Sequence, residues 1–319
     1  MTEFTNVLNS HVRLSRRRDE SERRKSEARR LIEARGYFTD PGLSLIVAGS
    51  MGRGEMGDRS DLDLFLLATK NFDESERAEL VACMDQVNSE LGYPAFSNRR
   101  YVKVYDLGDL LKNTGSPHDD SENYFTARML LLLEALPLAN DHTCCQIRDQ
   151  VLSQYFRDER GKGSYRPLFL LNDVLRYWRT LCLNYEVLRH ERDRPWWKKN
   201  INLKFSRMLT VFATVAVLTV REVHRKADFE SVCELSPHRR LALALNHLGD
   251  QELLQEYHQF LDDYETFLGW KEDRGVDTRA ETGEFQQTVQ EVADRFSDFL
   301  HRTLTHDRIP LSRRKYLVI

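Results

Sequence analysis

The sequence predicts an α+β protein, in which a small mixed sheet follows an N-terminal helix and precedes an all-α helical domain. Three observations support this fold class. Two short apolar runs, at residues 43–48 and 62–67, flank a polar loop and have the length of buried strands. A highly charged helical segment precedes them, and the chain beyond residue 116 shows helical periodicity. Because 319 residues suffice for two cores, we place the domains at residues 1–115 and 116–319.

The first predicted element is a surface helix at residues 13–35. This segment is dense in arginine and lysine, interleaved with aspartate and glutamate. Opposite charges three or four positions apart stabilise a helix, so we expect it to lie on the sheet with its charges in water. A second interpretation is that its arginines bind RNA or an acidic partner.

Three strands and one helix are predicted for the sheet. The first two strands are Leu43–Ala48 and Leu62–Leu67. A helix at residues 73–91 and a third strand at Tyr101–Asp106 follow. The segment Lys112–Pro117 contains both glycine and proline, which interrupt regular structure, and marks the predicted domain boundary.

Everything after this boundary is predicted to be helical. Pro167 is suited to the first turn of one helix, and Asn202 is expected to cap another. The apolar run Met208–Val220 is too short to span a bilayer, so we predict a buried helix and no membrane partner. The predicted helices cover residues 122–136, 168–189, 203–225, 237–248, 251–270 and 284–304.

Two aspartates next to the second strand carry the clearest chemical signal. Asp61 and Asp63 are two residues apart, so on a strand their side chains point to the same face. Neighbouring carboxylates repel each other unless a cation lies between them, and such hard oxygen ligands suit Mg²⁺. Gly49 and Ser50, which end the first strand, offer a backbone without Cβ and a hydroxyl for phosphate oxygens. The pattern therefore predicts nucleotide chemistry.

This pattern resembles the DNA polymerase β-like nucleotidyltransferase superfamily. The strings Gly49–Glu55 and Ser60–Leu64 are most similar to its PII-uridylyltransferase-like and minimal nucleotidyltransferase branch, over residues 40–110. The resemblance implies transfer of a nucleoside monophosphate from an NTP, such as ATP, to a hydroxyl, with release of pyrophosphate. It assigns metal binding to Asp61 and Asp63, with two Mg²⁺ ions (or Mn²⁺), and phosphate binding to Gly49 and Ser50.

The resemblance also implies a third carboxylate from a later strand. We assign Asp106, at the end of the third predicted strand, as this catalytic and metal-binding acid, with Asp109 as the second choice. One register of that strand places Lys103 where the family has its acid, and a one-residue slip exchanges the two faces. Asp106 is equally suited to capping the turn at residues 107–111.

Five basic residues are predicted phosphate ligands. Arg176 and Arg179 are three apart on one helix, and Lys204 and Arg207 are three apart on another. In a helical domain that closes the nucleotide cleft, these cations would neutralise phosphate charge. Arg53, in the phosphate loop, is a fifth candidate, unless it pairs with Glu55. The other four have alternative structural partners, namely Asp173, Glu186 and Glu222.

Several other patterns are weaker. Gly52-x-Gly54-x-x-Gly57 matches a dinucleotide-binding fingerprint, but a strand rather than a helix follows it, so we reject a Rossmann fold. Arg240 and His247 have a spacing similar to that of HEPN ribonucleases. The segment 194–200, with adjacent tryptophans and two lysines, suits either base stacking or packing between helices. The basic, then apolar, tail at residues 312–319 suits either a final strand or a partner contact.

Composition restricts the setting of this activity. A net charge of −3 does not favour a general nucleic-acid binder. Five cysteines without paired metal-ligand spacing, and no apolar signal region, predict a cytoplasmic protein with reduced thiols. We therefore expect an NTP and a protein or RNA acceptor as partners, with a homo-oligomer or a cognate protein as further partners. Two other interpretations remain: a synthase of oligonucleotide second messengers, cyclic or linear, and a nucleotide-binding regulatory module without turnover.

Overall fold

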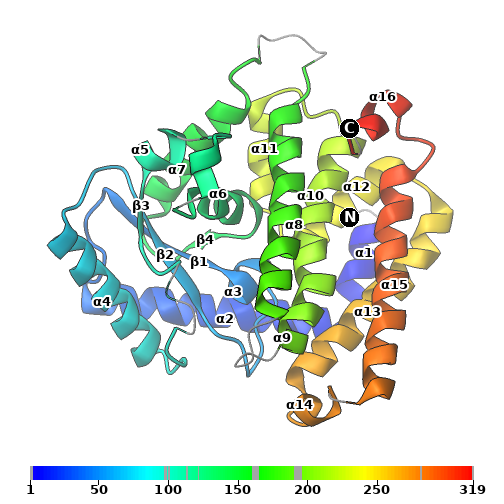
Figure 1. Cartoon of the computed structure of the whole chain (residues 1–319), viewed down its shortest axis with the longest axis horizontal. Coiled ribbons are helices and arrows are strands. Elements are labelled where there is room, and N and C mark those ends of the chain that lie inside the picture. The colour runs from blue at the N-terminus through cyan, green and yellow to red at the C-terminus, as the bar shows by residue number, and fades with distance from the viewer. Residues whose placement is uncertain are drawn as a thin grey trace. The chain divides into compact units, whose positions relative to one another are not determined.

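The computed structural model describes residues 3–96, 99, 101–112, 114–120, 122–159, 165–189, 196–280 and 282–317. In this part of the chain it confirms an α+β protein with one small mixed sheet and a large helical region (Figure 1). The chain divides into two compact units. The sheet unit comprises residues 17–165 and 225–236, and the helical unit comprises residues 1–16, 166–224 and 237–319. The boundary predicted at residues 115 and 116 lies inside the sheet unit.

The sheet has four strands in the order β3-β2-β1-β4. Strand β1 is antiparallel to both β2 and β4, whereas β2 is parallel to β3. The short strand β4 was not predicted. It lies in a segment that we expected to belong to the helix at residues 122–136, and that helix ends at Leu133. Pro137 has no N–H for the Leu133 carbonyl, and in a helix its ring would clash with that carbonyl, so the helix cannot continue through Pro137. The strands are β1 (Leu43–Ala48), β2 (Asp63–Ala68), β3 (Val104–Asp106) and β4 (Leu136–Pro137).

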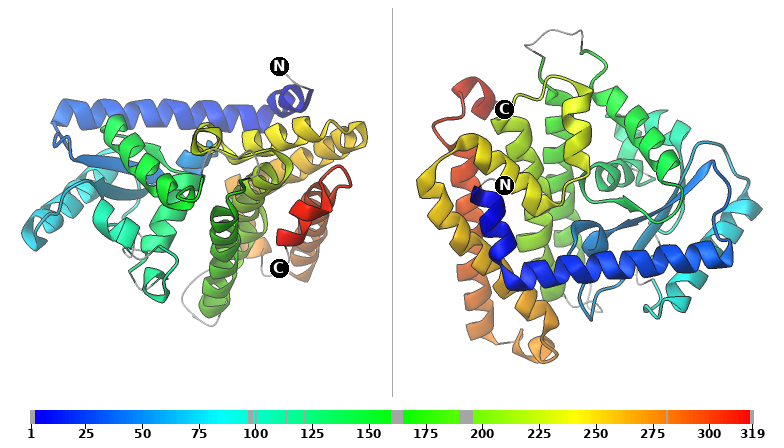
Figure 2. Two further views of the ribbon diagram at one scale, coloured as in Figure 1. Left: turned by 90° about the horizontal axis from the view of Figure 1, so that it is seen from above. Right: turned by 180° about the vertical axis from the view of Figure 1, so that it is seen from behind.

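Helices α2 and α4 supply side chains to the core on one face of the sheet. Figure 2 shows the long helix α2 running across the strands. Ala28 and Ile32 of α2 and Val87 of α4 pack in one cluster with alternate residues of β1 and β2. Helix α4 begins where predicted, because Asp73 caps it by accepting a hydrogen bond from the Glu76 N–H (2.9 Å). The helices of this unit are α2 (Val12–Arg35, from residue 17), α3 (Gly49–Arg53), α4 (Glu74–Glu90), α5 (Leu107–Lys112), η1 (Pro117–Asp120), α6 (Tyr124–Leu133), α7 (Asp141–Tyr155) and α11 (Lys226–Cys233).

The helical unit is built around α10, which packs against α8, α12 and α15. Stacked aromatic rings, such as Phe260 and Phe296 with centroids 4.3 Å apart, fill its core. The predicted helices at residues 168–189, 237–248, 251–270 and 284–304 are confirmed with small changes at their ends. Its elements are α1 (Glu3–Ser10), α8 (Leu168–Arg189), α9 (Trp196–Asn202), η2 (Leu203–Arg207), α10 (Met208–Val220), α12 (Pro237–Leu248), α13 (Gln251–Glu272), α14 (Val276–Arg279), α15 (Gly283–Thr305), α16 (Leu311–Arg314) and η3 (Lys315–Leu317).

The helix around residue 202 differs from the prediction. Asn202 has helical backbone angles and makes no capping bond, so α9, the π-helical stretch η2 and α10 form one continuous element that ends at Val220. The stretch Lys199–Val220 is long and apolar enough to cross a membrane by length and composition, which the run from Met208 alone is not. However, 72% of the apolar window is buried within the fold, as in the core helix of a soluble protein.

Candidate active site

The predicted phosphate loop and the second predicted acid are brought into direct contact by β1 and β2. Asp63 begins β2 and is the strand partner of Ala48, the residue before Gly49. Gly49 has φ +66°, and a Cβ added there would lie 1.9 Å from Asp63 Oδ2. The Asp63 carboxylate therefore lies over a backbone position that only glycine can occupy without displacing it.

Asp61 and Asp63 are both exposed, whereas Leu62 between them is buried in the core. The predicted alternation is therefore confirmed, and the acids lie at the rim of the sheet with access to solvent. Two exposed carboxylates beside a turn without Cβ are a donor set that fits one Mg²⁺ with water and phosphate oxygens as its other ligands. Across the described residues, no group of three or more His, Cys, Asp or Glu side chains could hold a metal ion.

The side chains of Ser50 and Arg53 are both buried in the interior of the protein. The Ser50 hydroxyl is buried, 3.1 Å from the sulfur of Met56. The Arg53 side chain is 5% exposed and pairs with Glu55 (3.0 Å) and Glu134 (2.7 Å). The alternative role of Arg53, pairing with Glu55, is thus the one observed. Since all three charged groups are buried, Arg53 stabilises the loop and is not available to phosphate.

Helix α2 holds the loop between α3 and β2. Arg17, only 3% exposed, donates to the Glu55 carbonyl (3.1 Å), and the Met56 N–H donates to the Ser21 hydroxyl (2.9 Å). One turn later, Arg24 lies 3.5 Å from Asp58. We had expected the charged side chains of this helix to lie in water. This holds for its other faces, but not for the face that carries Arg17 and Ser21. The spacing of residues 17, 21 and 24 was the available sequence signal for a buried polar face.

Two glycines of the dinucleotide-like fingerprint have structural explanations. A Cβ at Gly52 would lie 1.7 Å from the Glu134 carbonyl oxygen, and one at Gly57 would lie 1.9 Å from a nitrogen of Arg17. The strand that follows them, β2, is antiparallel to β1. This arrangement confirms that the motif is not a Rossmann fingerprint.

Asp106 is not brought to Asp61 and Asp63. It pairs with Ala68, the last residue of β2, whereas Asp63 is the first, so about 17 Å of strand separates the two positions. Side chains alternate, and Asp106 shares the face of Ala68 and Val104, which pack in the α2 and α4 core. The assignment of Asp106 as third metal ligand is therefore corrected.

Asp106 and Asp109 each have a hydrogen-bond partner that is unrelated to the predicted metal site. Arg77 donates to Asp106 Oδ2 and to the Val104 carbonyl (3.0 Å). Burial raises the pKa of Asp106, and the Arg77 guanidinium opposes that shift. Asp109, the second choice, accepts a hydrogen bond from the Tyr124 hydroxyl (3.0 Å).

Lys103 lies on the face of the sheet that carries Asp63. Its carbonyl accepts a hydrogen bond from the Leu66 N–H (3.0 Å), which places Lys103 beside Phe65, two residues after Asp63. The ammonium lies 5.0 Å from the ring centre of Tyr105, which shares this face with Phe65. The register of β3 therefore puts Lys103, and not Asp106, on the face of the sheet that carries Asp63.

The four remaining predicted phosphate ligands belong to the helical unit. Arg176 pairs with Asp173 at 3.4 Å, as the structural alternative proposed, and Arg179 is exposed on the same helix, α8. Lys204 donates to the side chain of Gln290, and burial lowers the pKa of Lys204. Lys204 and Arg207 both lie in the π-helical stretch η2, and α8 contacts this stretch. The structure therefore brings the two predicted pairs onto neighbouring elements of one unit.

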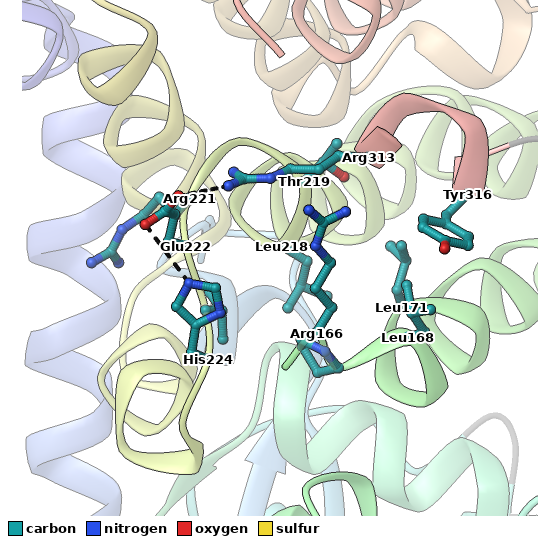
Figure 3. Close-up of a pocket in the computed structure, with 12 residues that line it drawn as sticks. Arg166, Leu168, Leu171, Leu218, Thr219, Arg221, Glu222, His224, Arg313 and Tyr316 are labelled. Atoms are coloured by element: carbon teal, nitrogen blue, oxygen red, sulfur yellow. Dashed lines mark hydrogen bonds and ion pairs between the residues drawn. The ribbon is translucent and has the colours of Figure 1, made fainter. Parts of the chain in front are cut away.

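The C-terminal tail contributes Arg313 and Tyr316 to the lining of a pocket in the helical unit (Figure 3). The tail forms α16 and η3 and not a strand, and Val318 and Ile319 lie outside the described residues. Arg313 donates to Glu222 (2.9 Å) and to the Val220 carbonyl (3.1 Å). Glu222, which we had considered as an ion-pair partner for the predicted phosphate ligands, therefore forms an ion pair with Arg313 of the tail.

The structure also bears on two of the weaker motifs, the pair Arg240 and His247 and the tryptophan-lysine segment at residues 194–200. Arg240 is fully buried and donates to the Thr214 hydroxyl (3.0 Å), whereas His247 is exposed. These two residues do not form a joint ribonuclease site. In the tryptophan-lysine segment, residues 194 and 195 and the side chains of residues 196–198 lie outside the described part of the chain.

Comparisons with known proteins do not assign a family. No family model matches the chain, and no curated protein matches it detectably.

Proposed function

We propose that the protein is a Mg²⁺-dependent nucleotidyltransferase, which moves an NMP from an NTP to a hydroxyl of a protein or RNA acceptor. One observation supports this most: the Asp63 carboxylate lies directly over Gly49, at the junction of the phosphate loop and β2. A triphosphate that approaches the Gly49 backbone would meet this carboxylate and that of Asp61 at the same point. A bound Mg²⁺ would there neutralise the phosphates and polarise the reacting groups.

The chain's own residues have limited and specific roles in this reaction. The acceptor oxygen forms a bond to the α-phosphorus, and the bond from that phosphorus to the bridging α,β-oxygen breaks. Pyrophosphate leaves with the electron pair, and the hydroxyl proton passes to water. Asp61 and Asp63 hold the ion, the Gly49 backbone allows close approach of the phosphates, and α2 fixes the loop through Arg17 and Ser21.

A second candidate is a nucleotide-binding module without turnover, and Lys103 favours it. Lys103 is a cation at the position where the resemblance implies a carboxylate, and Asp106 lies on the other face. In this alternative, NTP binds and remains intact.

The experiment that separates the candidates is incubation with α-labelled NTPs and Mg²⁺, with and without cell extract. Label on a protein or RNA band would support macromolecular transfer, and a labelled small product without extract would indicate a messenger synthase. Stable binding of NTP without pyrophosphate release would indicate the regulatory module. A protein that neither binds nor turns over any NTP would contradict both candidates.

Asp106→Asn is expected to leave NTP affinity within about twofold of wild type, because Asp106 is on the opposite face from Asp63. The free energy of unfolding should fall by about 1–3 kcal/mol, since Arg77 loses its charged partner. Titration with a non-hydrolysable NTP and denaturant unfolding would measure the two quantities. Loss of NTP binding in a fully folded variant would show that Asp106 does belong to the nucleotide site.

We place the protein in the cytoplasm as part of this proposal. All five cysteines are free thiols, which fits a reducing compartment. An NTP-dependent reaction also needs a compartment that contains nucleoside triphosphates.

A further inference from the structure

Glu134 is a carboxylate buried beside the predicted phosphate loop. It follows α6 directly, after the apolar stretch Met129–Leu133, and its side chain is only 1% exposed. A charged group in such surroundings is costly to bury unless it has a partner. The backbone leaves helical geometry at Glu134, and Arg53 Nη1 donates to Glu134 Oε2 at 2.7 Å. Glu134 therefore joins the end of α6 to α3.

The backbone of Glu134 also packs against α3. A Cβ added at Gly52 would lie 1.7 Å from the Glu134 carbonyl oxygen and 3.4 Å from the Val47 carbonyl oxygen. Leu136, two residues after Glu134, pairs with Val47 in the sheet. Glu134 is thus fixed next to the strand from which the phosphate loop starts, and it contacts α3 through both its side chain and its carbonyl group.

The short helix α3 connects Glu134 to the predicted metal site. Its first residue is Gly49, over which the Asp63 carboxylate lies, and its last residue is Arg53. Because α3 has only five residues, it has little stability as an isolated helix and depends on tertiary contacts for its position. The ion pair between Arg53 and Glu134 is such a contact, at the opposite end of α3 from Gly49.

We propose that Glu134 is a positioning residue of the nucleotide site. Its carboxylate holds Arg53, and through α3 it fixes the Gly49 backbone, and so the phosphates of an NTP, relative to the bound ion. This inference rests on the proposed function and extends it to a residue outside the predicted motif. Because Asp61 and Asp63 hold the ion, loss of the Glu134 carboxylate should reduce the rate of transfer much more than the affinity for NTP.

Glu134→Gln tests this role, because it keeps the shape of the side chain and removes its charge. In the full-length protein, kcat for NMP transfer should fall by about 10- to 100-fold, since a misplacement of about 1 Å can cost this much. The Kd for an α,β-methylene NTP with Mg²⁺ should change by no more than about threefold, because both metal ligands remain. The Gly54 and Glu55 N–H groups close α3 by donating to carbonyls within it, at 3.0 and 2.7 Å. Their hydrogen exchange should become at least about tenfold faster.

Asp119→Asn is the matched control. The ion pair between Arg128 of α6 and Asp119 is also fully buried, but it joins α6 to η1 and not to α3. Each substitution removes a charged partner of a buried arginine, so both variants should unfold at a lower denaturant concentration than the wild type. Only Glu134→Gln should change kcat and hydrogen exchange in α3. Glu134→Asp keeps the charge but is one methylene shorter, and it serves as the second variant, with the same expected results, if the glutamine variant does not fold.

The outcomes separate this inference from the proposed function. Wild-type kcat in a folded Glu134→Gln protein, or equal losses of kcat in Glu134→Gln and Asp119→Asn, would overturn the role of Glu134 and leave the proposed function standing. If the wild type bound NTP without transfer, faster exchange in α3 of Glu134→Gln alone would support the inference, and unchanged exchange would overturn it. If the wild type neither bound nor transferred any nucleotide, the proposed function itself would fail, and this inference with it.

Discussion

Asp63→Asn should reduce nucleotidyl transfer by at least about 10³-fold, equivalent to about 4 kcal/mol of transition-state stabilisation. The asparagine keeps the size of the side chain over Gly49 but removes the charge that holds a divalent ion. Because Asp63 is exposed, the free energy of unfolding should change by no more than about 0.5 kcal/mol. Pyrophosphate release and transfer of an α-labelled NMP would measure the effect.

Asp58→Asn is the matched control for this substitution. Asp58 is a fully exposed carboxylate in the same loop, and it lies 3.5 Å from Arg24. Its neutralisation changes the local charge by the same amount but removes no predicted metal ligand, so transfer should stay near the wild-type rate. Equal rates for Asp63→Asn and Asp58→Asn would exclude Asp63 from the reaction.

Gly49→Ala should reduce transfer by about 10²-fold or more, because the new methyl group must displace the Asp63 carboxylate. The added Cβ would lie 1.9 Å from Asp63 Oδ2, and a misplacement of about 1 Å can cost a factor of this size. The φ angle of +66° adds strain of about 1–2 kcal/mol to the folded state. Both quantities are measurable on the same preparation, by NMP transfer and by denaturant unfolding.

Gly36→Ala is the control that separates backbone strain at a positive φ from the collision between the new methyl group and Asp63. Gly36 has nearly the same φ, +65°, but nothing lies within 4 Å of a Cβ added there. We expect a similar loss of stability in the two variants and a loss of transfer only in Gly49→Ala. If Gly36→Ala reduced transfer equally, general destabilisation would explain both results.

The parts of the fold that depend on local pattern were predictable. The apolar run of β1 and the helices α4 and α8 were found within a residue or two, because hydrophobic periodicity, the capping residue Asp73 and Pro167 act locally. The juxtaposition of Gly49 and Asp63 followed from the antiparallel pairing of two neighbouring strands. The strand β4 was missed, because two residues next to an apolar helix carry no period of their own.

The register of β3 was not predictable, and the site depends on it. Asp106 and Lys103 differ by an odd number of positions, so the choice of register decides which of them shares a face with Asp63. That choice is made by tertiary contacts, in which Val104 joins the core on the α2 and α4 side. The buried pairing of Arg53 with Glu134 likewise joins residues that are 81 positions apart. Such partners leave no local signal in one sequence.

A nucleotide site on Asp61 and Asp63 is tested most directly by a calorimetric titration of the purified protein with an α,β-methylene NTP, with and without Mg²⁺. We predict one site per chain, with binding that requires Mg²⁺, persists in Asp106→Asn and is lost in the Asp61→Asn, Asp63→Asn double variant. Binding of equal affinity in the double variant, or binding that does not depend on Mg²⁺, would contradict a nucleotide site built on these two aspartates.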